Sequence, residues 1–368
     1  MSETNLGSFQ IGPAVIGEGS SVYVVAEVGV NHNGQASVAR ELIHAAADAE
    51  ADAVKFQVFA ADRLVTRSAP AAAYQRRVIG ATGQYEMLSA LELGYDQFAD
   101  LAAYAGHCGV EFLATPFSTQ DLQFLVSIGV RAIKLASPDI VNGPLIDAAG
   151  DTGLPTIVST GAAYYEEVAA AVKRFRSRTT AGPLALLHCI SSYPADEREA
   201  NLAAIGTLAR SFHCVSGFSD HTESLTIGGY AAAAGARIIE KHLTLDRSQS
   251  GPDHGFSFEP QMLATYIRNT RRTEQLLGTG RIAPTASEQD VRRLARGSVV
   301  AVCDIHAGEI LTPSMLTIKR PGGGIPPNEI DALIGGQVLA DIAADTPITW
   351  DLIAESSARR HQPEPVGV

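Results

Sequence analysis

The sequence predicts a (β/α)8 barrel followed by a smaller second domain. Short apolar runs alternate with longer helical stretches eight times between residues 22 and 277. Parallel strands require helical crossovers, so this alternation indicates a parallel sheet covered by helices. A doubly wound open sheet is the alternative fold. The G-x-G-x-x-G motif of its dinucleotide-binding form is missing after the first strand.

Each of the eight units is a predicted strand followed by a predicted helix. In chain order they span residues 22–28 and 37–49, 53–58 and 97–107, 111–114 and 119–128, 132–135 and 144–149, 155–158 and 165–176, 184–189 and 201–211, 214–217 and 224–234, and 237–242 and 260–277. Hydrophobic residues make up 46% of the chain, so a sizeable core can form.

The alternation ends after Gly278, and the sequence divides there into further parts. Residues 1–280 form the predicted catalytic barrel, residues 281–296 a polar and charged linker, and residues 297–355 a cap domain of short strands with Gly and Pro between them. Residues 356–368 are expected to form a disordered tail. So small a cap has a marginal core by itself, so we expect it to dock on the barrel or on a partner subunit.

The net charge limits the classes of binding partner, and the cysteine content indicates the cellular compartment. Lys and Arg number 28 against 40 Asp and Glu, a net charge of −12, which argues against nucleic acid and against a polybasic membrane anchor. The four cysteines are scattered without C-x-x-C pairs, which favours free, mostly buried thiols in a reducing compartment. Without a secretion signal or a run of about 20 apolar residues, we expect a cytoplasmic protein.

Polar and ionisable residues lie at the end of every predicted strand. They are Glu27 with Asn31-His32-Asn33-Gly34, Lys55 with Gln57, Thr115 with Ser118, Lys134 with Ser137, Ser159-Thr160-Gly161, His188 with Ser191 and Tyr193, Ser219-Asp220-His221, and Glu240-Lys241-His242. In a barrel these ends converge on one mouth, where the chemistry occurs. Any one of them could be an ordinary strand-end polar group or helix cap, but eight together favour an active site.

Two lysines, Lys55 and Lys134, directly follow apolar residues on separate predicted strands. A buried ammonium group is costly unless an anion accompanies it. Structural pairing with Glu27 or Glu240 and a Schiff-base lysine are two interpretations. The hydroxyls at Thr115, Ser137 and Ser159 favour a third interpretation, a pocket for a phosphate and a carboxylate.

His221 and His242 end the seventh and eighth predicted strands, so their imidazoles can meet. Two neutral imidazoles together with water and substrate oxygens suit a divalent ion such as Mn²⁺. A histidine pair that is hydrogen-bonded to Asp220 or Glu240 is the alternative.

Several strings then resemble the sialic acid (N-acetylneuraminate) synthase family, which includes legionaminic and pseudaminic acid synthases. They are Ala26-Glu27-Val28-Gly29-Val30-Asn31-His32-Asn33-Gly34, Asp52-Ala53-Val54-Lys55-Phe56-Gln57, Ala114-Thr115-Pro116-Phe117-Ser118, Val158-Ser159-Thr160-Gly161, Phe218-Ser219-Asp220-His221-Thr222, Glu240-Lys241-His242 and Gly251-Pro252-Asp253-His254. Lys319-Arg320-Pro321-Gly322 and Gly324 resemble the antifreeze-like (SAF) domain of that family. The ordered series covers about residues 15 to 353.

The resemblance implies a transferase that forms a carbon–carbon bond. Phosphoenolpyruvate would condense with an N-acylated amino sugar, N-acetylmannosamine or a related diacetamido sugar, to give phosphate and a nine-carbon 2-keto acid. The resemblance also implies a divalent metal, Mn²⁺ or Mg²⁺, and no organic cofactor. It implies a domain-swapped homodimer in which each cap domain covers the barrel of the partner.

Residue by residue, the resemblance assigns roles to the strand-end side chains. Glu27 falls at the family's catalytic glutamate, and His221 and His242 fall at its metal ligands. The phosphoenolpyruvate set is Lys55, Thr115, Lys134, Ser137, Ser159 and Ser191. The sugar-side set is Gln57, Asp139, Tyr193 and Asp253, with Arg320 offered across the dimer to the acyl group.

Three strings depart from the family pattern. Ser137-Pro138-Asp139 replaces Ser-Gly-Glu, Cys189-Ile190-Ser191 replaces Cys-Thr-Ser or Cys-Thr-Asn, and Arg296-Gly297-Ser298 replaces Arg-Arg-Ser. The first leaves the acceptor sugar open, because Asp139 is one methylene shorter than the family's glutamate.

Two other functions compete with this one. The first is another phosphoenolpyruvate-condensing barrel that makes a shorter keto acid from a phosphorylated sugar, against which the Arg320-bearing cap and the neutral sugar contacts argue. The second is a non-catalytic sugar-binding relative, against which the intact Glu27, lysines and histidines argue.

Overall fold

The computed structural model describes residues 7–70 and 83–354. Its internal contacts divide the chain into two compact units, Met1–Thr279 and Gly280–Val368. Each unit has a hydrophobic core of its own. The predicted disordered tail, residues 356–368, lies outside the described residues.

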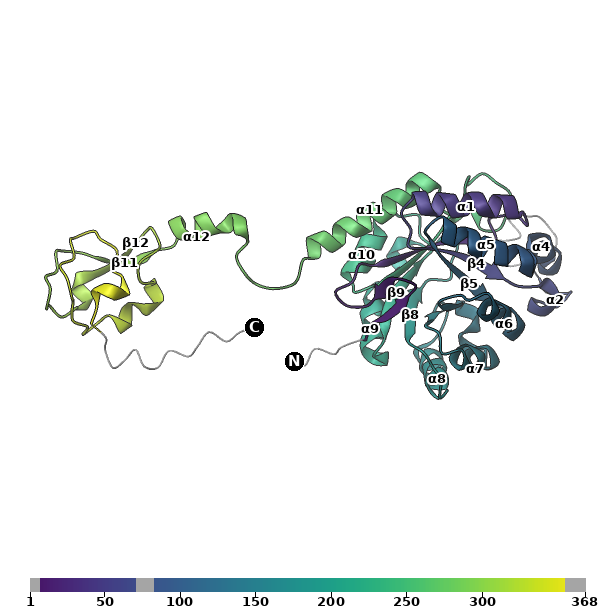
Figure 1. Ribbon diagram of the computed structural model, residues 1–368, viewed down its shortest axis with the longest axis horizontal. Coiled ribbons are helices and arrows are strands. Elements are labelled where there is room, and N and C mark those ends of the chain that lie inside the picture. The colour runs from purple at the N-terminus through teal and green to yellow at the C-terminus, as the bar shows by residue number, and fades with distance from the viewer. Residues whose placement is uncertain (1–6, 71–82, 355–368) are drawn as a thin grey trace. The chain divides into compact units, whose positions relative to one another are not determined.

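Eight parallel strands form the centre of the first unit (Figure 1). They are β3 (Tyr23–Gly29), β4 (Ala53–Val58), β5 (Glu111–Pro116), β6 (Ile133–Leu135), β7 (Thr156–Ser159), β8 (Leu184–Cys189), β9 (Val215–Asp220) and β10 (Ile238–His242). Their order is β5-β4-β3-β10-β9-β8-β7-β6, so that the first barrel strand, β3, pairs with the last, β10. The sheet is therefore a nearly closed barrel, which confirms the predicted (β/α)8 fold.

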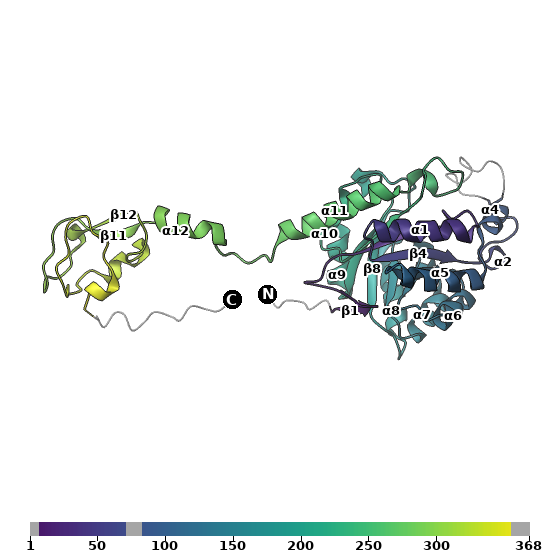
Figure 2. The ribbon, with the colours of Figure 1, turned by 45° about the horizontal axis from the view of Figure 1, so that its top comes forward.

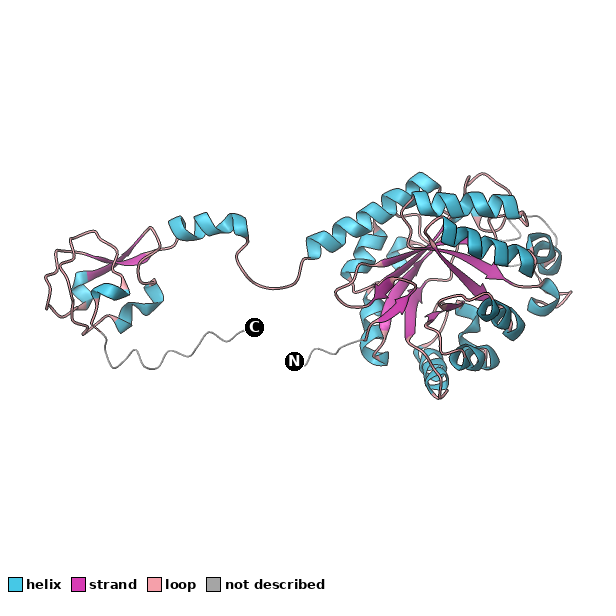
Figure 3. Ribbon diagram, viewed as in Figure 1, coloured by secondary structure: helices cyan, strands magenta, loops and turns pink. Residues whose placement is uncertain are grey.

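Helices surround the strands on the outside of the barrel (Figures 2 and 3). They are α1 (Ala36–Asp48), α2 (Ala61–Leu64), α4 (Gln84–Leu91), α5 (Tyr95–His107), α6 (Thr119–Ser127), α7 (Gly143–Asp151), α8 (Tyr165–Arg176), α9 (Ala203–Phe212), α10 (Ile227–Ala233) and α11 (Pro260–Leu277). The sequence did not predict α2 and α4, which lie within the long connection from β4 to α5. Single turns of 3-10 helix are η1 (Ser137–Val141), η2 (Glu197–Glu199) and η3 (His254–Phe256).

Alternation of side chains along each strand aims the functional residues into the barrel. In β3, Val24 and Ala26 pack outward against the helices, whereas Tyr23 and Val25 belong to a separate cluster inside the barrel. Successive side chains of a strand point to opposite faces, so Glu27 continues the inner row toward the mouth. Ala53 and Leu113 belong to the same inner cluster, so the residues two positions later on β4 and β5 face inward too.

A short hairpin that the sequence did not predict covers the amino-terminal end of the barrel. Its strands are β1 (Phe9–Ile11) and β2 (Ala14–Ile16), which pair in antiparallel fashion. Phe9, Ile11 and Ile16 join the inner cluster of the barrel. Strands of three residues show too little alternation to be predicted from a polar, glycine-rich segment.

The second unit contains the antiparallel pair β11 (Ser298–Ala301) and β12 (Leu316–Lys319). Its remaining elements are the helix α12 (Gln289–Ala295) and the 3-10 turns η4 (Ala286–Glu288), η5 (Pro313–Met315), η6 (Pro327–Ala332) and η7 (Trp350–Leu352). The helix α12 lies inside the segment that the sequence presented only as a polar linker, residues 281–296.

The described residues also test the expectations of free, mostly buried thiols and of a chain without a membrane-spanning segment. All four cysteines are free, with Cys189 and Cys214 buried and Cys303 exposed. Fewer of them are buried than the sequence suggested. No helix in the described part of the chain is both long enough and apolar enough to cross a membrane.

Candidate active site

A pocket of about 380 Å³ opens at the carboxyl ends of the barrel strands. Its lining includes predicted residues of all four roles, catalytic, metal-binding, donor-binding and sugar-binding: Glu27, Lys55, Gln57, Thr115, Lys134, Ser137, Asp139, Ser159, Tyr193, His221, His242 and Asp253. Two predicted residues do not line it. Ser191 is exposed beside the pocket, and Arg320 belongs to the second unit. The structure therefore brings most of the predicted residues together in one place.

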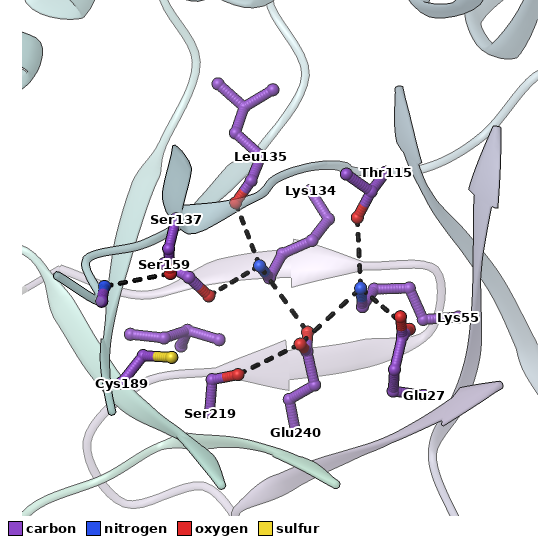
Figure 4. Close-up of polar contacts among 12 residues, drawn as sticks. Glu27, Lys55, Thr115, Lys134, Leu135, Ser137, Ser159, Cys189, Ser219 and Glu240 are labelled. Atoms are coloured by element: carbon purple, nitrogen blue, oxygen red, sulfur yellow. Dashed lines mark hydrogen bonds and ion pairs between the residues drawn. The ribbon is translucent and has the colours of Figure 1, made fainter. Parts of the chain in front are cut away.

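Lys55 lines this pocket and contacts two carboxylates (Figure 4). Its Nζ atom is 2.8 Å from Oε2 of Glu27 and 3.6 Å from Oε1 of Glu240. It also donates a hydrogen bond of 3.1 Å to the Thr115 hydroxyl. All of these groups are buried, so each charge is compensated within the cluster.

Lys134 approaches Glu240 from the side opposite to Lys55 (Figure 4). Its Nζ atom donates to the Ser159 hydroxyl at 2.7 Å and lies 3.8 Å from Oε2 of Glu240. The Ser219 hydroxyl donates to Oε1 of Glu240 at 3.2 Å. The Glu240 carboxylate thus links the two lysines and fixes the spacing between their ammonium groups.

Burial and charge pairing set the ionisation of this cluster. Burial raises the pKa of the Glu27 carboxyl, and Lys55 opposes that rise. Burial would also raise the pKa of the Glu240 carboxyl, but the charges of Lys134 and Lys55 bring that pKa below its usual value. Burial would lower the pKa of Lys55, but Glu240 and Glu27 raise it. Glu240 is thus the ionised partner of the lysines, whereas Glu27 is the carboxylate more readily protonated.

A cradle of hydroxyls surrounds Gly161, at the end of β7. The Gly161 N–H donates to the Ser137 hydroxyl at 3.0 Å. A Cβ atom at this glycine would lie 2.3 Å from Oγ of Ser191 and 2.9 Å from Oγ of Ser137. Ser191 therefore belongs to the same cluster as Ser137, although it does not line the pocket. Only glycine leaves this space open.

The sugar-side candidates are held in the pocket by specific contacts. Nε2 of Gln57 donates to Oε1 of Glu27 at 2.9 Å, and Nδ2 of Asn142 donates to Oδ1 of Asp139 at 2.9 Å. Burial raises the pKa of Asp139. Burial, followed by repulsion from Glu27, raises the pKa of Asp253 to about 7.

His221 and His242 meet at one side of the pocket, with ring centroids 5.2 Å apart. Nδ1 of His221 lies 2.8 Å from the Ile190 carbonyl oxygen and donates to it, which leaves Nε2 available as a ligand. Nδ1 of His242 is buried without a hydrogen-bond partner. Burial holds the pKa of His242 well below its usual value, so its imidazole is neutral.

These histidines fit a divalent cation in an open site. The orphaned Nδ1 of His242 and the oriented ring of His221 supply two nitrogen ligands, which suit Mn²⁺ and related ions. Within residues 7–70 and 83–354, no group of three or more His, Cys, Asp and Glu forms a closed metal site. Two protein ligands would leave positions for water or substrate oxygens, as catalytic sites require.

Asp220 and Lys241 each lie between two pocket residues in the sequence, and their side chains point away from the pocket. Nζ of Lys241 lies 2.9 Å from Oδ2 of Asp220 and 4.0 Å from the ring centroid of Phe258. The alternative in which Asp220 pairs with a histidine is therefore wrong, because its carboxylate serves this lysine on the outer face.

Two parts of the pocket received no role from the sequence. The first is the linking function of Glu240, which had appeared only as a possible partner of the lysines or of the histidines. The second is an apolar wall, which we define as Val30, Leu64, Met87, Leu88, Leu91 and Phe117. Glu240 could have been found from its place at a strand end. The wall depends on α2 and α4, so no local pattern signalled it.

The barrel and its polar mouth define an enzyme, because lysines, histidines and carboxylates converge where barrel enzymes act. The NeuB family model matches residues 42–282, and the SAF domain model matches residues 296–354. The chain belongs to the NeuB family, and several of its relatives are named as legionaminic, pseudaminic or N-acetylneuraminate-9-phosphate synthases.

Individual relatives agree with this assignment. The chain is 38% identical to the N,N'-diacetyllegionaminic acid synthase of Legionella pneumophila over 341 residues, 92% of this chain and 96% of that protein. The synthase of the same name from Campylobacter jejuni is 37% identical over 85% of this chain and 94% of its own length. The solved N-acetylneuraminic acid synthetase of Leptospira borgpetersenii, in complex with citrate, is 37% identical and matches 77% of this chain and 95% of its own with a TM-score of 0.69.

Proposed function

We propose that this enzyme condenses phosphoenolpyruvate with the aldehyde form of an N-acylated amino sugar. The products are a nine-carbon 2-keto acid and phosphate. The observation that carries the proposal is the pair of buried lysines, Lys55 and Lys134, set among hydroxyls in a pocket that two histidines also line. The names of the relatives support the class of product, a nonulosonic acid.

The lysines and hydroxyls suit a donor that carries both a phosphate and a carboxylate. Lys55 and Lys134 would neutralise charge, while the hydroxyls of Thr115 and Ser159, which they already contact, would donate hydrogen bonds. The cradle at Gly161 offers space beside two further serine hydroxyls. Such a clamp aligns the enol carbon of the donor with the acceptor.

His221 and His242 would hold the divalent ion, Mn²⁺ or Mg²⁺. When bound, such an ion supplies Lewis-acid polarisation of a carbonyl oxygen. The protein's own part is to keep both imidazoles oriented, His221 through its bond to the Ile190 carbonyl and His242 by burial.

Glu27 is the group proposed to act on the donor. Bond formation between C3 of phosphoenolpyruvate and the aldehyde carbon develops positive charge at C2 of the donor, which the Glu27 carboxylate would stabilise. Water then adds to C2 with Glu27 accepting its proton, the alkoxide formed from the aldehyde oxygen takes up a proton in exchange, and the tetrahedral adduct expels phosphate to leave the keto group. The raised pKa of Glu27 makes its carboxylate a stronger base than that of an ordinary glutamate.

The second unit is proposed to serve the active site of a partner subunit, as a domain-swapped homodimer requires. Val291 and Leu294 on α12 are 63% and 57% exposed, so this short helix has apolar side chains available for docking. In that arrangement Arg320 would reach the acyl group of the sugar. We also propose a cytoplasmic location, which the free thiols support.

A phosphate-release assay tests the proposed function against its alternatives. Purified enzyme with Mn²⁺ and phosphoenolpyruvate should release phosphate only when an N-acylated amino sugar is added. Release only with a phosphorylated pentose would favour the shorter keto-acid synthase. No release with any acceptor would favour the non-catalytic relative.

A further inference from the structure

A buried ion pair lies on the outer side of the two strands that lead to the histidines. Asp220 of β9 and Lys241 of β10 are register partners in the parallel pairing of these strands, and both are fully buried. Oδ2 of Asp220 lies 2.9 Å from Nζ of Lys241, and the ring of Phe258 covers the ammonium group with its centroid at 4.0 Å. Neither charged residue lines the pocket. The pair is therefore buried behind the site, without contact with a substrate.

Both members of the pair hold Thr222, the residue that follows His221. Oδ1 of Asp220 accepts a 2.8 Å hydrogen bond from the Thr222 N–H, and Nζ of Lys241 donates to the Thr222 carbonyl oxygen. Lys241 directly precedes His242 in the sequence. One side chain thus connects the strand of one histidine to the chain just beyond the other histidine.

This connection begins where the pairing of the two strands stops. The ladder between β9 and β10 ends at Asp220 and Lys241, one residue before the histidines. Past that point, backbone pairing no longer fixes the distance between the two chain segments. The hydrogen bond from Lys241 to the Thr222 carbonyl oxygen continues the link. We therefore expect the spacing of the two imidazoles, whose ring centroids are 5.2 Å apart, to depend on it.

Fold stability alone does not explain a pair of charges at this place. Both groups lose their hydration on burial, and replacing a buried ion pair with uncharged residues of similar volume is often neutral or stabilising. Contacts that orient the ligands of a metal, in contrast, typically contribute 10- to 100-fold to metal affinity. The position of the pair, directly beside both histidines, favours the second role.

We propose that Asp220 and Lys241 are positioning residues for the divalent cation, which set the spacing of His221 and His242 by holding Thr222 from both strands. The proposal rests on the proposed function, because it takes these two histidines as the ligands of the ion. The pair acts through the main chain and touches neither the ion nor a substrate.

The double variant Asp220→Asn/Lys241→Met tests this role. It removes one negative and one positive charge, so the net charge beside the histidines is unchanged and no buried charge loses its partner. Asn can still accept the hydrogen bond from the Thr222 N–H, whereas Met cannot donate to the carbonyl oxygen. Titration calorimetry of the metal-free protein with Mn²⁺ should show a dissociation constant about 10- to 100-fold higher than that of wild type.

Asp52→Asn/Arg271→Met is the matched control. It removes an ion pair of 2.7 Å, between Nη2 of Arg271 and Oδ2 of Asp52, at the amino-terminal end of the barrel, and it should bind Mn²⁺ like wild type. The calorimetric stoichiometry reports the folded fraction of each protein. Partial unfolding therefore lowers the number of binding sites, whereas a lost positioning contact raises the dissociation constant.

The outcomes separate this proposal from the one on which it depends. Wild-type affinity in Asp220→Asn/Lys241→Met, failure of this variant to fold, or an equal loss of affinity in the control would make the pair a purely structural feature and overturn the positioning role alone. Failure of the wild type to bind Mn²⁺, or equal affinity in wild type and His242→Ala, would overturn the proposed metal site and this proposal with it.

Discussion

The Lys55 ammonium lies 2.8 Å from Oε2 of Glu27, and the two side chains are 4% and 1% exposed. Lys55 has a second carboxylate neighbour, Glu240 at 3.6 Å, and a hydroxyl acceptor in Thr115. Loss of the Glu27 charge therefore leaves the lysine with partners. This redundancy allows the role of Glu27 in catalysis to be separated from any role in folding.

Glu27→Gln should be nearly inactive and folded. We expect kcat to fall by about 10²- to 10⁴-fold, the usual range for loss of a general acid or base, with little change in melting temperature. Phosphate release and thermal unfolding would be measured on the same preparation. Glu166→Gln, an exposed position on α8, is the matched control and should keep full turnover. Near-normal turnover of Glu27→Gln would remove Glu27 from the mechanism.

Gly161→Ala should damage the binding of the donor. The added Cβ would lie 2.3 Å from Oγ of Ser191, so the hydroxyl cradle must shift. Displacements of about 1 Å can cost 10²-fold in rate, so we expect kcat/KM for phosphoenolpyruvate to fall by that order. Gly106→Ala, in α5 with no atom within 4 Å of the new Cβ, should retain activity and gain about 1 kcal/mol of stability. Unchanged steady-state kinetics for Gly161→Ala would show that the cradle holds no substrate.

The Asp253 carboxyl should make the stability of the metal-free enzyme fall as the pH rises. Its pKa is about 7 in the folded state and about 3.9 in an unfolded chain. Between these values the folded state holds a proton that the unfolded state has lost, so folding becomes less favourable up to about pH 7 and then levels off. The full difference corresponds to about 4 kcal/mol.

Urea unfolding in the presence of a chelator, from pH 5 to pH 8, would measure this dependence. Asp253→Asn should lack the decline, so its stability relative to wild type should increase with pH. Asp100→Asn, at an exposed position on α5, should keep the wild-type slope. Parallel pH profiles for wild type and Asp253→Asn would refute the assignment.

His242→Ala should weaken metal binding by more than about 100-fold, because even residues that only orient a ligand typically contribute 10- to 100-fold. Titration calorimetry with Mn²⁺ measures this loss without reference to turnover. His107→Ala, an exposed histidine at the end of α5, should bind like wild type. Equal affinity in all three proteins would place the cation elsewhere.

The sequence predicted the barrel well because its strands carry the signal locally. In β3 the inner row Tyr23, Val25 and Glu27 ends in an ionisable residue, and inner rows of other strands end in ionisable or hydroxyl side chains such as Thr115, Ser159 and Ser219. The convergence of these ends follows from the fold itself, so most site residues could be predicted.

Other features depend on contacts between distant residues. The hairpin β1–β2 is too short to show a period, and its place is set by packing inside the barrel. The apolar wall joins residues from the loop after β3, from two unpredicted helices and from the end of β5. Whether Glu240 pairs with one lysine or links both depends on the geometry of the closed sheet, which no single strand encodes.

The central claim is that this pocket joins phosphoenolpyruvate to an amino-sugar aldehyde. Mass spectrometry of the product formed from phosphoenolpyruvate labelled with ¹³C at all of its carbon atoms tests this claim most directly. We predict a nine-carbon 2-keto acid that carries every labelled carbon, formed together with an equal amount of phosphate. Labelled pyruvate as the sole carbon product, or a product lacking the label, would contradict the account.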